Sequence, residues 1–280
     1  MDPISALDLP ALDVSRDEQD PRVLLVRLDD PSRRNVMGEA MTASWVRLME
    51  ALRALGAQPG VAGEVRAVVL TGSGSAFSSG GDLSWLSDGT GAGATVAALR
   101  TRMARYYDDW LGVRSVALPV VAAVNGPAVG AGLGLALACD VRLVGASAWV
   151  SAPFTALGLH PGMATTLTLA QAVGPAVARE LLLTGRAVGA DEAVRLGLAT
   201  SVHADDDLVE AALGVARTVA TRSSVATRLL LQGLAGGGPR DLHDAVAQES
   251  LAQAVTLATD DLAEGLAAAR EHRAPRFTGR

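Results

Sequence analysis

Short apolar runs alternate with amphipathic segments along the first 150 residues of the chain. Apolar runs bounded by turn-forming residues predict strands, and apolar positions at helical spacing predict helices. Beyond residue 165 the spacing is almost wholly helical. The pattern therefore predicts an α/β fold with a helical C-terminal part. The expected strands are residues 23–28, 65–70, 120–124, 141–144 and 149–151, and the expected helices among them are residues 39–55, 96–111 and 130–138.

We expect the chain to have three parts, which differ in charge and in predicted secondary structure. Residues 1–20 carry five Asp and one Glu, and no basic stretch precedes an apolar one there. We therefore expect a flexible acidic tail rather than a signal peptide. Residues 21–204 hold the alternating strands and helices and form the expected core. Residues 205–280 form the expected C-terminal helical region.

One segment imitates a membrane span. Residues 115–139 carry no charged side chain over 25 positions, which is long enough to cross a bilayer. Pro119, Asn125 and Pro127 interrupt it, however, and a strand, a turn and a buried helix explain the segment better. We expect no membrane span and a cytoplasmic protein.

Composition excludes several kinds of chemistry. All 24 basic residues are arginines, so a P-loop or a Schiff-base lysine is absent. Cys139 is the only cysteine, which excludes an internal disulfide and a multi-cysteine zinc site. We expect no metal. The net charge of −6 argues against a nucleic-acid partner, which requires a basic surface.

Two glycine-rich loops follow predicted strands, at residues 76–83 and 125–134. Backbone N–H groups are accessible in such loops, and the second loop also opens a helix, whose N-terminus attracts negative charge. Each loop could direct one N–H at the same carbonyl oxygen, although tight turns and close packing also explain either loop alone. A dinucleotide site is excluded, because Leu135 stands where a G-x-G-x-x-G motif counted from Gly130 requires glycine.

These loops, taken with further segments in the same order, resemble the crotonase superfamily, also called the enoyl-CoA hydratase/isomerase family. The resemblance covers the chain from Val23 to Arg280. The segments that carry it are Asp30-Pro31 with Arg34-Asn35, then residues 71–83, 118–143, 157–162, 181–202 and 272–280.

The resemblance implies a crotonase-type spiral of repeated ββα units, followed by a helical trimerisation region. It implies a homotrimer or a dimer of trimers. It also implies an acyl-CoA or enoyl-CoA thioester as substrate, as in fatty acid metabolism. Coenzyme A then arrives as part of the substrate, and no separate cofactor is expected.

The resemblance also assigns roles to residues of the two loops. The backbone amides of Gly81 and Ala131 match the family's oxyanion donors, which hold the thioester oxygen as it gains enolate charge. Arg33 stands where a basic residue often meets the phosphates of coenzyme A. The further positions expected to border coenzyme A are Ser79, Gly81, Asp82, Leu83 and Ala131, with Arg276 and Phe277 as candidates that simple helix-end contacts explain equally well.

Two family positions have lost their carboxylates. Hydratases of the family activate water with two glutamates, and here Gly134 and Phe154 occupy those positions. Neither side chain can transfer a proton. Because general acid–base catalysis contributes about 10²–10⁴-fold per positioned group, we expect ordinary hydratase activity to be severely weakened. An isomerase also needs a proton shuttle, commonly the second of these glutamates.

Few residues could replace the lost carboxylates. His160 lies near the right segment and titrates in a useful range, but a histidine beside Pro-Gly is typically a hydrogen-bonded turn residue. Asp88 and Asp108 could reach inward from neighbouring segments. Asp82 is expected instead to cap a short helix that starts at Leu83.

Three functions remain open from the sequence. In the first, the chain is an enzyme that acts on a CoA thioester, for example an isomerase, and uses an unconventional acid or base such as His160 or an aspartate. Alternatively, it is a non-catalytic acyl-CoA carrier or sensor, which the missing carboxylates favour. A hydrolase would require a contact between a serine and His160 or His203.

Overall fold

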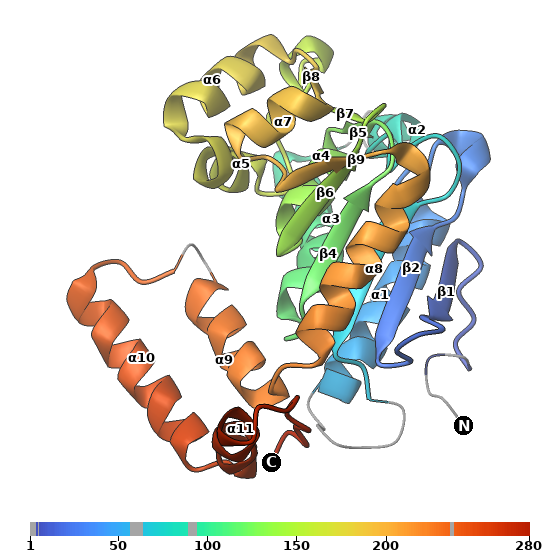
Figure 1. Cartoon of the computed structure of the whole chain (residues 1–280). Helices are drawn as coiled ribbons and strands as arrows, with labels where there is room; N and C mark the ends of the chain where they lie inside the picture. Colours follow the sequence, from blue (N-terminus) through green and yellow to red (C-terminus); the bar gives the residue numbers. More distant parts are fainter. Residues whose placement is uncertain (1–3, 5, 57–63, 89–93, 236–237) are drawn as a thin grey trace.

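A parallel sheet forms the centre of the computed structural model, which describes residues 4, 6–56, 64–88, 94–235 and 238–280 (Figure 1). Within these residues the sheet has six strands in the order β1-β2-β3-β4-β6-β9. Its edge strand β1 runs antiparallel to β2, and the remaining neighbours are parallel. The strands are β1 (Leu12–Arg16), β2 (Val23–Leu28), β3 (Ala67–Gly72), β4 (Val120–Val124), β6 (Val141–Gly145) and β9 (Ser201–His203).

A second, smaller sheet lies beyond the C-terminal ends of β4 and β6. It consists of β5 (Ala128–Val129), β7 (Trp149–Ser151) and β8 (Val188–Gly189), in the order β5-β7-β8. In two successive stretches of the chain, a strand of the central sheet is therefore followed by a strand of the smaller sheet and then by a helix. The predicted crotonase-type spiral with a helical C-terminal region is confirmed.

Helices cover both faces of the central sheet (Figure 1). Alternate strand residues point to opposite faces: Leu24 and Val26 pack in the cluster that contains α1 and α3, whereas Val23 and Leu25 pack against α8. The apolar runs are continuous because both faces are buried. The helices are α1 (Glu39–Gly56), α2 (Leu83–Asp88), α3 (Val96–Leu111), α4 (Ala131–Ala138), α5 (Thr165–Val173), α6 (Pro175–Thr184), α7 (Ala190–Leu196), α8 (Leu208–Ala220), α9 (Ser224–Leu234), α10 (Leu242–Leu257) and α11 (Asp260–Arg270).

The predicted elements agree closely with the observed ones. Strands at 23–28, 120–124 and 149–151 and the helix at 96–111 have the predicted bounds. The segment that imitates a membrane span folds as β4, β5 and α4. Among the described residues, no helix is both long and apolar enough to cross a membrane.

The prediction of a flexible tail over residues 1–20 is wrong for residues 12–16. They form β1, which pairs with β2 from Leu12 opposite Leu28 to Arg16 opposite Leu24. Only alternate side chains of β1 are partly or fully buried, as on an edge strand with one packed face. The acidic residues in and around this short strand hid the alternation in the sequence.

The last helices form a C-terminal arm, defined as α9, α10 and α11 with residues 271–280, which projects away from the sheet (Figure 1). By contrast, α8 lies C-terminal to the boundary expected at residue 204 but packs on the sheet. The division of the chain at that residue stays a prediction.

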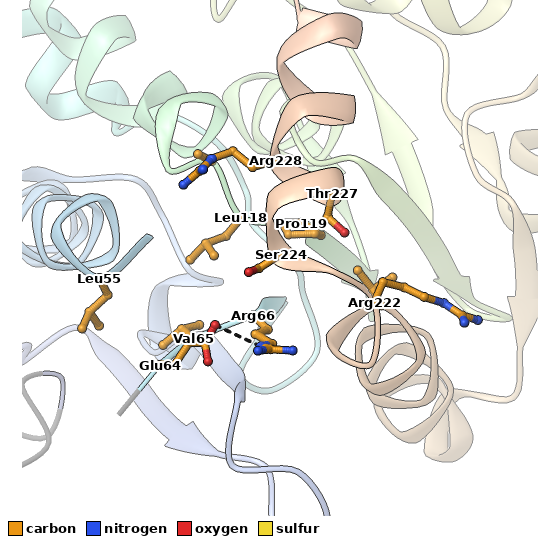
Figure 2. A pocket seen from close by; sticks show the side chains of 12 residues that line it. Leu55, Glu64, Val65, Arg66, Leu118, Pro119, Arg222, Ser224, Thr227 and Arg228 are labelled. Carbon is orange, nitrogen blue, oxygen red and sulfur yellow. Dashed lines mark hydrogen bonds and ion pairs between the residues drawn. The ribbon is translucent and has the colours of Figure 1, made fainter. Parts of the chain in front are cut away.

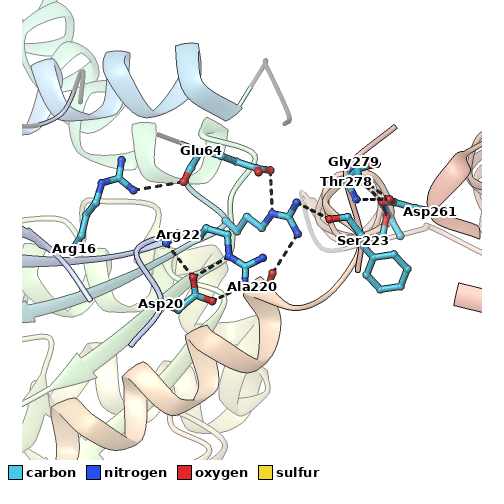
Figure 3. A network of polar contacts seen from close by, with 12 residues as sticks. Arg16, Asp20, Arg22, Glu64, Ala220, Ser223, Asp261, Thr278 and Gly279 are labelled. Carbon is cyan, nitrogen blue, oxygen red and sulfur yellow. Dashed lines mark hydrogen bonds and ion pairs between the residues drawn. The ribbon is translucent and has the colours of Figure 1, made fainter. Parts of the chain in front are cut away.

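A polar network ties the C-terminal arm to the core (Figure 3). The buried Arg66 donates hydrogen bonds to the carbonyl oxygens of Ala220, at 3.4 Å, and Phe277, at 3.2 Å. Asp261, also buried, accepts from the Ser223 hydroxyl and the Thr278 N–H, both at 2.7 Å. The chain end is thereby held against the end of α8.

A shallow cavity lies where the C-terminal arm leaves the core (Figure 2). Leu118 and Pro119, just before β4, line it together with Ser224 at the start of α9. The Arg66–Glu64 ion pair, with a nitrogen–oxygen distance of 3.0 Å, borders it. This cavity is at the N-terminal ends of the parallel strands, whereas both glycine-rich loops follow the C-terminal ends.

Candidate functional site

The two glycine-rich loops run side by side. They leave β3 and β4, which are adjacent parallel strands, so both emerge at the same edge of the sheet. The Ser78 N–H donates to the Pro127 carbonyl at 3.1 Å, and the Val129 N–H donates to the Ser78 carbonyl at 3.0 Å. The loops therefore continue the strand pairing for a short distance beyond the sheet.

Glycines allow the loops to touch backbone to backbone. A Cβ atom on Gly80, whose φ is +92°, would lie 2.4 Å from the Val129 oxygen and 3.2 Å from the Ala131 nitrogen. A Cβ atom on Gly132 would lie 2.5 Å from the Ser78 oxygen. Close packing is thus one function of these glycines. It also sets Gly81 beside the first turn of α4.

The backbone N–H groups of Gly81 and Ala131 at this junction have no hydrogen-bond acceptor among the described residues, and neither do those of Gly132 and Leu133 in the first turn of α4. Ala131 is the first residue of α4, where helix geometry leaves the N–H unpaired. Gly81 is partly exposed, and Ala131 is 8% exposed. Neither N–H is therefore committed to a hydrogen bond within the described residues.

The expected border of the coenzyme lies on the α2 side of this junction. Asp82 caps α2, as predicted: its Oδ1 accepts from the Ser84 N–H at 2.9 Å and the Trp85 N–H at 3.4 Å. Its Oδ2 accepts from Arg33 at 2.7 Å. Leu83 is exposed, and the Ser79 hydroxyl donates to the Arg33 carbonyl at 3.3 Å. The structure thus brings these four positions together.

Its contacts make Asp82 a poor proton acceptor. The Ser84 hydroxyl and then the Arg33 guanidinium, together with backbone N–H groups, lower the pKa of Asp82 to about 2. The carboxylate therefore stays ionised at neutral pH and acts as a cap and ion-pair partner. The Arg33 side chain remains 55% exposed despite the pairing.

An aromatic group that the sequence did not single out supports α2. Tyr106 stacks on Trp85 with ring centroids 5.0 Å apart, and the Arg102 guanidinium lies 3.7 Å from the Trp85 ring centroid. The Tyr106 hydroxyl donates to the Met37 carbonyl at 3.0 Å. Burial raises the pKa of Tyr106, so this phenol stays protonated. The sequence placed Tyr106 only within the predicted helix at residues 96–111, with no role of its own.

Apolar side chains lie close to both positions at which the resemblance expects glutamates. A Cβ atom on Gly134 would lie only 2.4 Å from the Cβ atom of Met163, which is fully buried. The ring of Phe154 lies 3.8 Å from the position of a Cβ atom on Gly130. The role of Met163 had no signal in the sequence, because it depends on a contact between distant segments.

His160 has the features of a turn residue. Its side chain is exposed, and its Nδ1 lies 2.8 Å from the carbonyl oxygen of the adjacent Pro161. Asp108 is exposed on α3. The side chain of Asp88 lies outside the described residues. No carboxylate gathers with His or Cys into a metal site within the described ranges.

A serine–histidine contact exists elsewhere in the molecule. The Ser201 hydroxyl lies 2.7 Å from Nε2 of His203 on the edge strand β9, two strands away from β4. No carboxylate pairs with His203 in the part of the chain that the structure describes. The contact therefore lacks the third group that orients a catalytic histidine.

Arg276 and Phe277 are not brought to the glycine-rich loops within the chain. The Arg276 N–H donates to Glu264 at 2.7 Å, and the Phe277 ring packs against α11 near Gly265. Both residues lie in the C-terminal arm, at the opposite end of the molecule from α2 and α4 (Figure 1). Within this chain, the contacts of both residues with α11 agree with the helix-end interpretation.

Comparison with known proteins extends over nearly the whole chain. The family model described as enoyl-CoA hydratase/isomerase matches residues 18–280. The chain is 43% identical over 260 residues to "Probable enoyl-CoA hydratase EchA14" of Mycobacterium tuberculosis, covering 91% of this chain and 96% of that protein. It is 33% identical to the 2,3-dehydroadipyl-CoA hydratase of Escherichia coli, with coverage of 92% and 96%.

Solved structures give the same similarity. DspI of Pseudomonas aeruginosa superposes with a TM-score of 0.85 at 29% identity, covering 98% of this chain and 99% of that one. The enoyl-CoA hydratase of Bacillus anthracis superposes with a TM-score of 0.81 at 31% identity, covering 95% and 99%.

Proposed function

This chain belongs to the enoyl-CoA hydratase/isomerase family, and from that premise we propose that it is a cytoplasmic protein that binds an acyl-CoA or enoyl-CoA thioester at the two glycine-rich loops. In this proposal the N–H groups of Gly81 and Ala131 donate to the thioester carbonyl oxygen. The observation that carries the proposal is this pair of amides without acceptors, held together by the loop contacts at Gly80 and Gly132.

Such a pair of donors favours an enolate over a neutral thioester. When a thioester loses an α-proton, negative charge moves onto its carbonyl oxygen. Donors that already point at that oxygen stabilise the charge without reorganising, and each is typically worth about 10²–10³-fold in rate. Coenzyme A belongs to the ligand, so the proposal needs no separate cofactor.

The groups around the site favour binding over hydration. Hydration needs a base that activates water, and Gly134 and Phe154 cannot supply one. Asp82 is tied to Arg33 and holds its proton too weakly, and Tyr106 holds its proton too firmly. A non-catalytic carrier or sensor therefore fits this site better than an ordinary hydratase. An enzyme that uses His160 remains the alternative.

The first prediction removes one donor. Ala131→Pro deletes the N–H at the first helical position, where proline is well tolerated. Val96→Pro makes the same change at the exposed start of α3 and is the matched control. Isotope-edited infrared spectra of bound butyryl-CoA should show a lowered carbonyl stretch with the parent protein and Val96→Pro, and a smaller shift with Ala131→Pro.

Several outcomes of this experiment discriminate among the functions. Equal carbonyl stretches in Ala131→Pro and the parent protein would refute the role of Ala131. If the same samples hydrate crotonyl-CoA at ordinary enzyme rates, the proposal of a non-catalytic carrier or sensor is refuted. Release of free coenzyme A that Ser201→Ala abolishes would favour a hydrolase that uses the Ser201–His203 contact.

We also propose that the protein assembles as a homotrimer or a dimer of trimers through the C-terminal arm. Helix α10 has no buried residue in the single chain. Its large apolar side chains Leu242, Val246, Leu251 and Val255 are all exposed. They lie on more than one face of the helix, a pattern typical of a helix that is covered on several sides.

A further inference from the structure

One edge of the first glycine-rich loop is fastened to the segment that leads into α1. The Ser79 N–H donates to the Arg34 carbonyl at 2.9 Å, and the Met37 N–H donates to the Gly80 carbonyl at 2.8 Å. An isolated parallel β-bridge pairs Met37 with Gly81. The chain just before α1 therefore lies along this part of the loop and holds it by its backbone.

The peptide group between Gly80 and Gly81 is held on one side only. Its carbonyl oxygen accepts from Met37, whereas its N–H, which belongs to Gly81, has no acceptor within the described ranges. In a planar trans peptide the carbonyl and the N–H point in opposite directions. The hydrogen bond from Met37 therefore fixes the direction of the free N–H, which points away from Met37.

A buried tyrosine on α3 completes this arrangement. The Tyr106 hydroxyl donates to the Met37 carbonyl at 3.0 Å. Met37 is only 1% exposed, and a buried carbonyl without a donor costs energy, so this hydrogen bond stabilises the position of Met37. The same hydroxyl lies 3.6 Å from the position of a Cβ atom on Gly81. Tyr106 thus reaches the loop at the residue that carries the free N–H.

The ring of Tyr106 is itself held in place by two tryptophans. Besides stacking on Trp85 of α2, it lies with its centroid 6.5 Å from that of Trp110. Trp110 is fully buried, and its indole N–H donates to the Thr42 hydroxyl of α1 at 3.0 Å. The Tyr106 hydroxyl therefore extends from a ring that is packed against both α1 and α2.

We infer that Tyr106 is a positioning residue that fixes the direction of the Gly81 N–H through Met37. The inference rests on the proposed donation of that N–H to a thioester carbonyl oxygen. Tyr106 acts here without touching the ligand, because its hydroxyl holds Met37 and Met37 holds the Gly80 carbonyl. Donors that are fixed before the ligand arrives need no reorganisation, which is what makes them effective.

The test removes only the hydroxyl. Tyr106→Phe keeps the stacked ring and deletes the donor to Met37. Tyr107→Phe makes the same change at the next residue of α3, whose hydroxyl faces Gly162 instead, and is the matched control. Hydrogen exchange of the Met37 N–H, measured without ligand and relative to the Val129 N–H of the second loop, reports whether the hydroxyl holds this contact. Isotope-edited infrared spectra of bound butyryl-CoA report the effect on the carbonyl group.

In Tyr106→Phe we expect the Met37 N–H to exchange about fivefold faster and the carbonyl stretch to be shifted less than in the parent protein. Tyr107→Phe should match the parent protein in both measurements. An unchanged exchange rate or an unchanged carbonyl stretch in Tyr106→Phe would show that Tyr106 is only a core residue, and the proposed function would stand.

The opposite failure gives a different result. If the carbonyl stretch of butyryl-CoA is not shifted by the parent protein itself, the proposed function fails and the inference with it. Should Tyr106→Phe not fold, Tyr106→Met provides the same comparison, because methionine also fills apolar space and lacks the donor.

Discussion

Glycine has two different roles at the single-residue scale in this site. At Gly80 and Gly132 the absence of a side chain lets two backbones touch. At Gly134 it leaves room for a side chain from another segment, that of Met163. The second role means that the absence of a side chain at position 134 and the position of Met163 depend on each other.

This dependence predicts the effect of adding one methyl group. Gly134→Ala should lower the free energy of unfolding by about 1–3 kcal/mol, because its Cβ atom overlaps Met163 in a packed core. Gly214→Ala is the matched control: Gly214 lies in α8 with no atom within 4 Å of its Cβ position. It should instead gain about 0.5–1 kcal/mol from helix propensity. Urea unfolding measures both.

The pair can also be tested for coupling. Met163→Gly removes the overlapping Cβ atom, so Gly134→Ala should cost less in that background than in the parent protein. Independent, additive effects of the two substitutions would show that they do not share the space.

At the scale of single elements, α2 depends on contacts at its first turn. It is only six residues long, and Asp82 supplies both its N-terminal cap and an ion pair to Arg33. Isolated helices of this length are not stable in water, so tertiary contacts must hold it. Trp85, which contacts both Tyr106 and Arg102, supplies the apolar part of that support.

The pKa of Asp82 predicts a pH dependence. Because the carboxylate binds protons less readily when folded, with a pKa of about 2, it stabilises the protein fully above its unfolded pKa. That contribution is lost as the pH falls from about 4 toward 2. Asp82→Asn should therefore be less stable than the parent protein at pH 6, and the difference should shrink toward pH 2.

Arg33→Gln provides the matched comparison for this experiment. It removes the ion pair and keeps the contacts from Asp82 to Ser84 and Trp85. Arg33→Gln should lower the stability less than Asp82→Ala does. Asp82→Ala also removes the cap of α2, and loss of a cap by itself costs about 0.5–2 kcal/mol. A stability difference between parent and Asp82→Asn that is constant from pH 6 to pH 2 would contradict this account.

At the scale of the whole molecule, the C-terminal arm is anchored at one end and uncovered along its length. Arg66 and Asp261 bind the chain end, whereas α10 has only partly or fully exposed residues in the single chain. An element that buries so little of its own apolar surface gains stability by packing against other copies.

The assembly can be measured directly. Light scattering after gel filtration should give three or six times the 28.6 kDa mass of one chain. Replacing Leu251 and Val255 with Glu should give a monomer, because two charges would be buried in the contact. Leu183→Glu, an equally exposed leucine on α6, is the control and should leave the mass unchanged. A monomeric parent protein would refute the proposed trimer.

The local pattern of residues was sufficient to predict much of the secondary structure of this protein and its two glycine-rich loops. Apolar runs and helical spacing placed most strands and helices of the first 150 residues to within two positions, because both faces of the sheet are buried and leave a clear signal. Glycine and its neighbours marked both loops, and the cap at Asp82 followed from residue type. The family resemblance added the spiral fold.

The remaining features depend on contacts between segments that are far apart in the chain. The edge strand β1 exists because β2 offers it hydrogen-bond partners, and the acidic residues in and around it concealed it in the sequence. The pairing of Arg33 with Asp82 spans 49 positions of the chain. The contact between Gly134 and Met163 depends on a strained turn held by α3 and α4. Residue spacing records local geometry, and no local pattern specifies which distant side chain fills a space left by glycine.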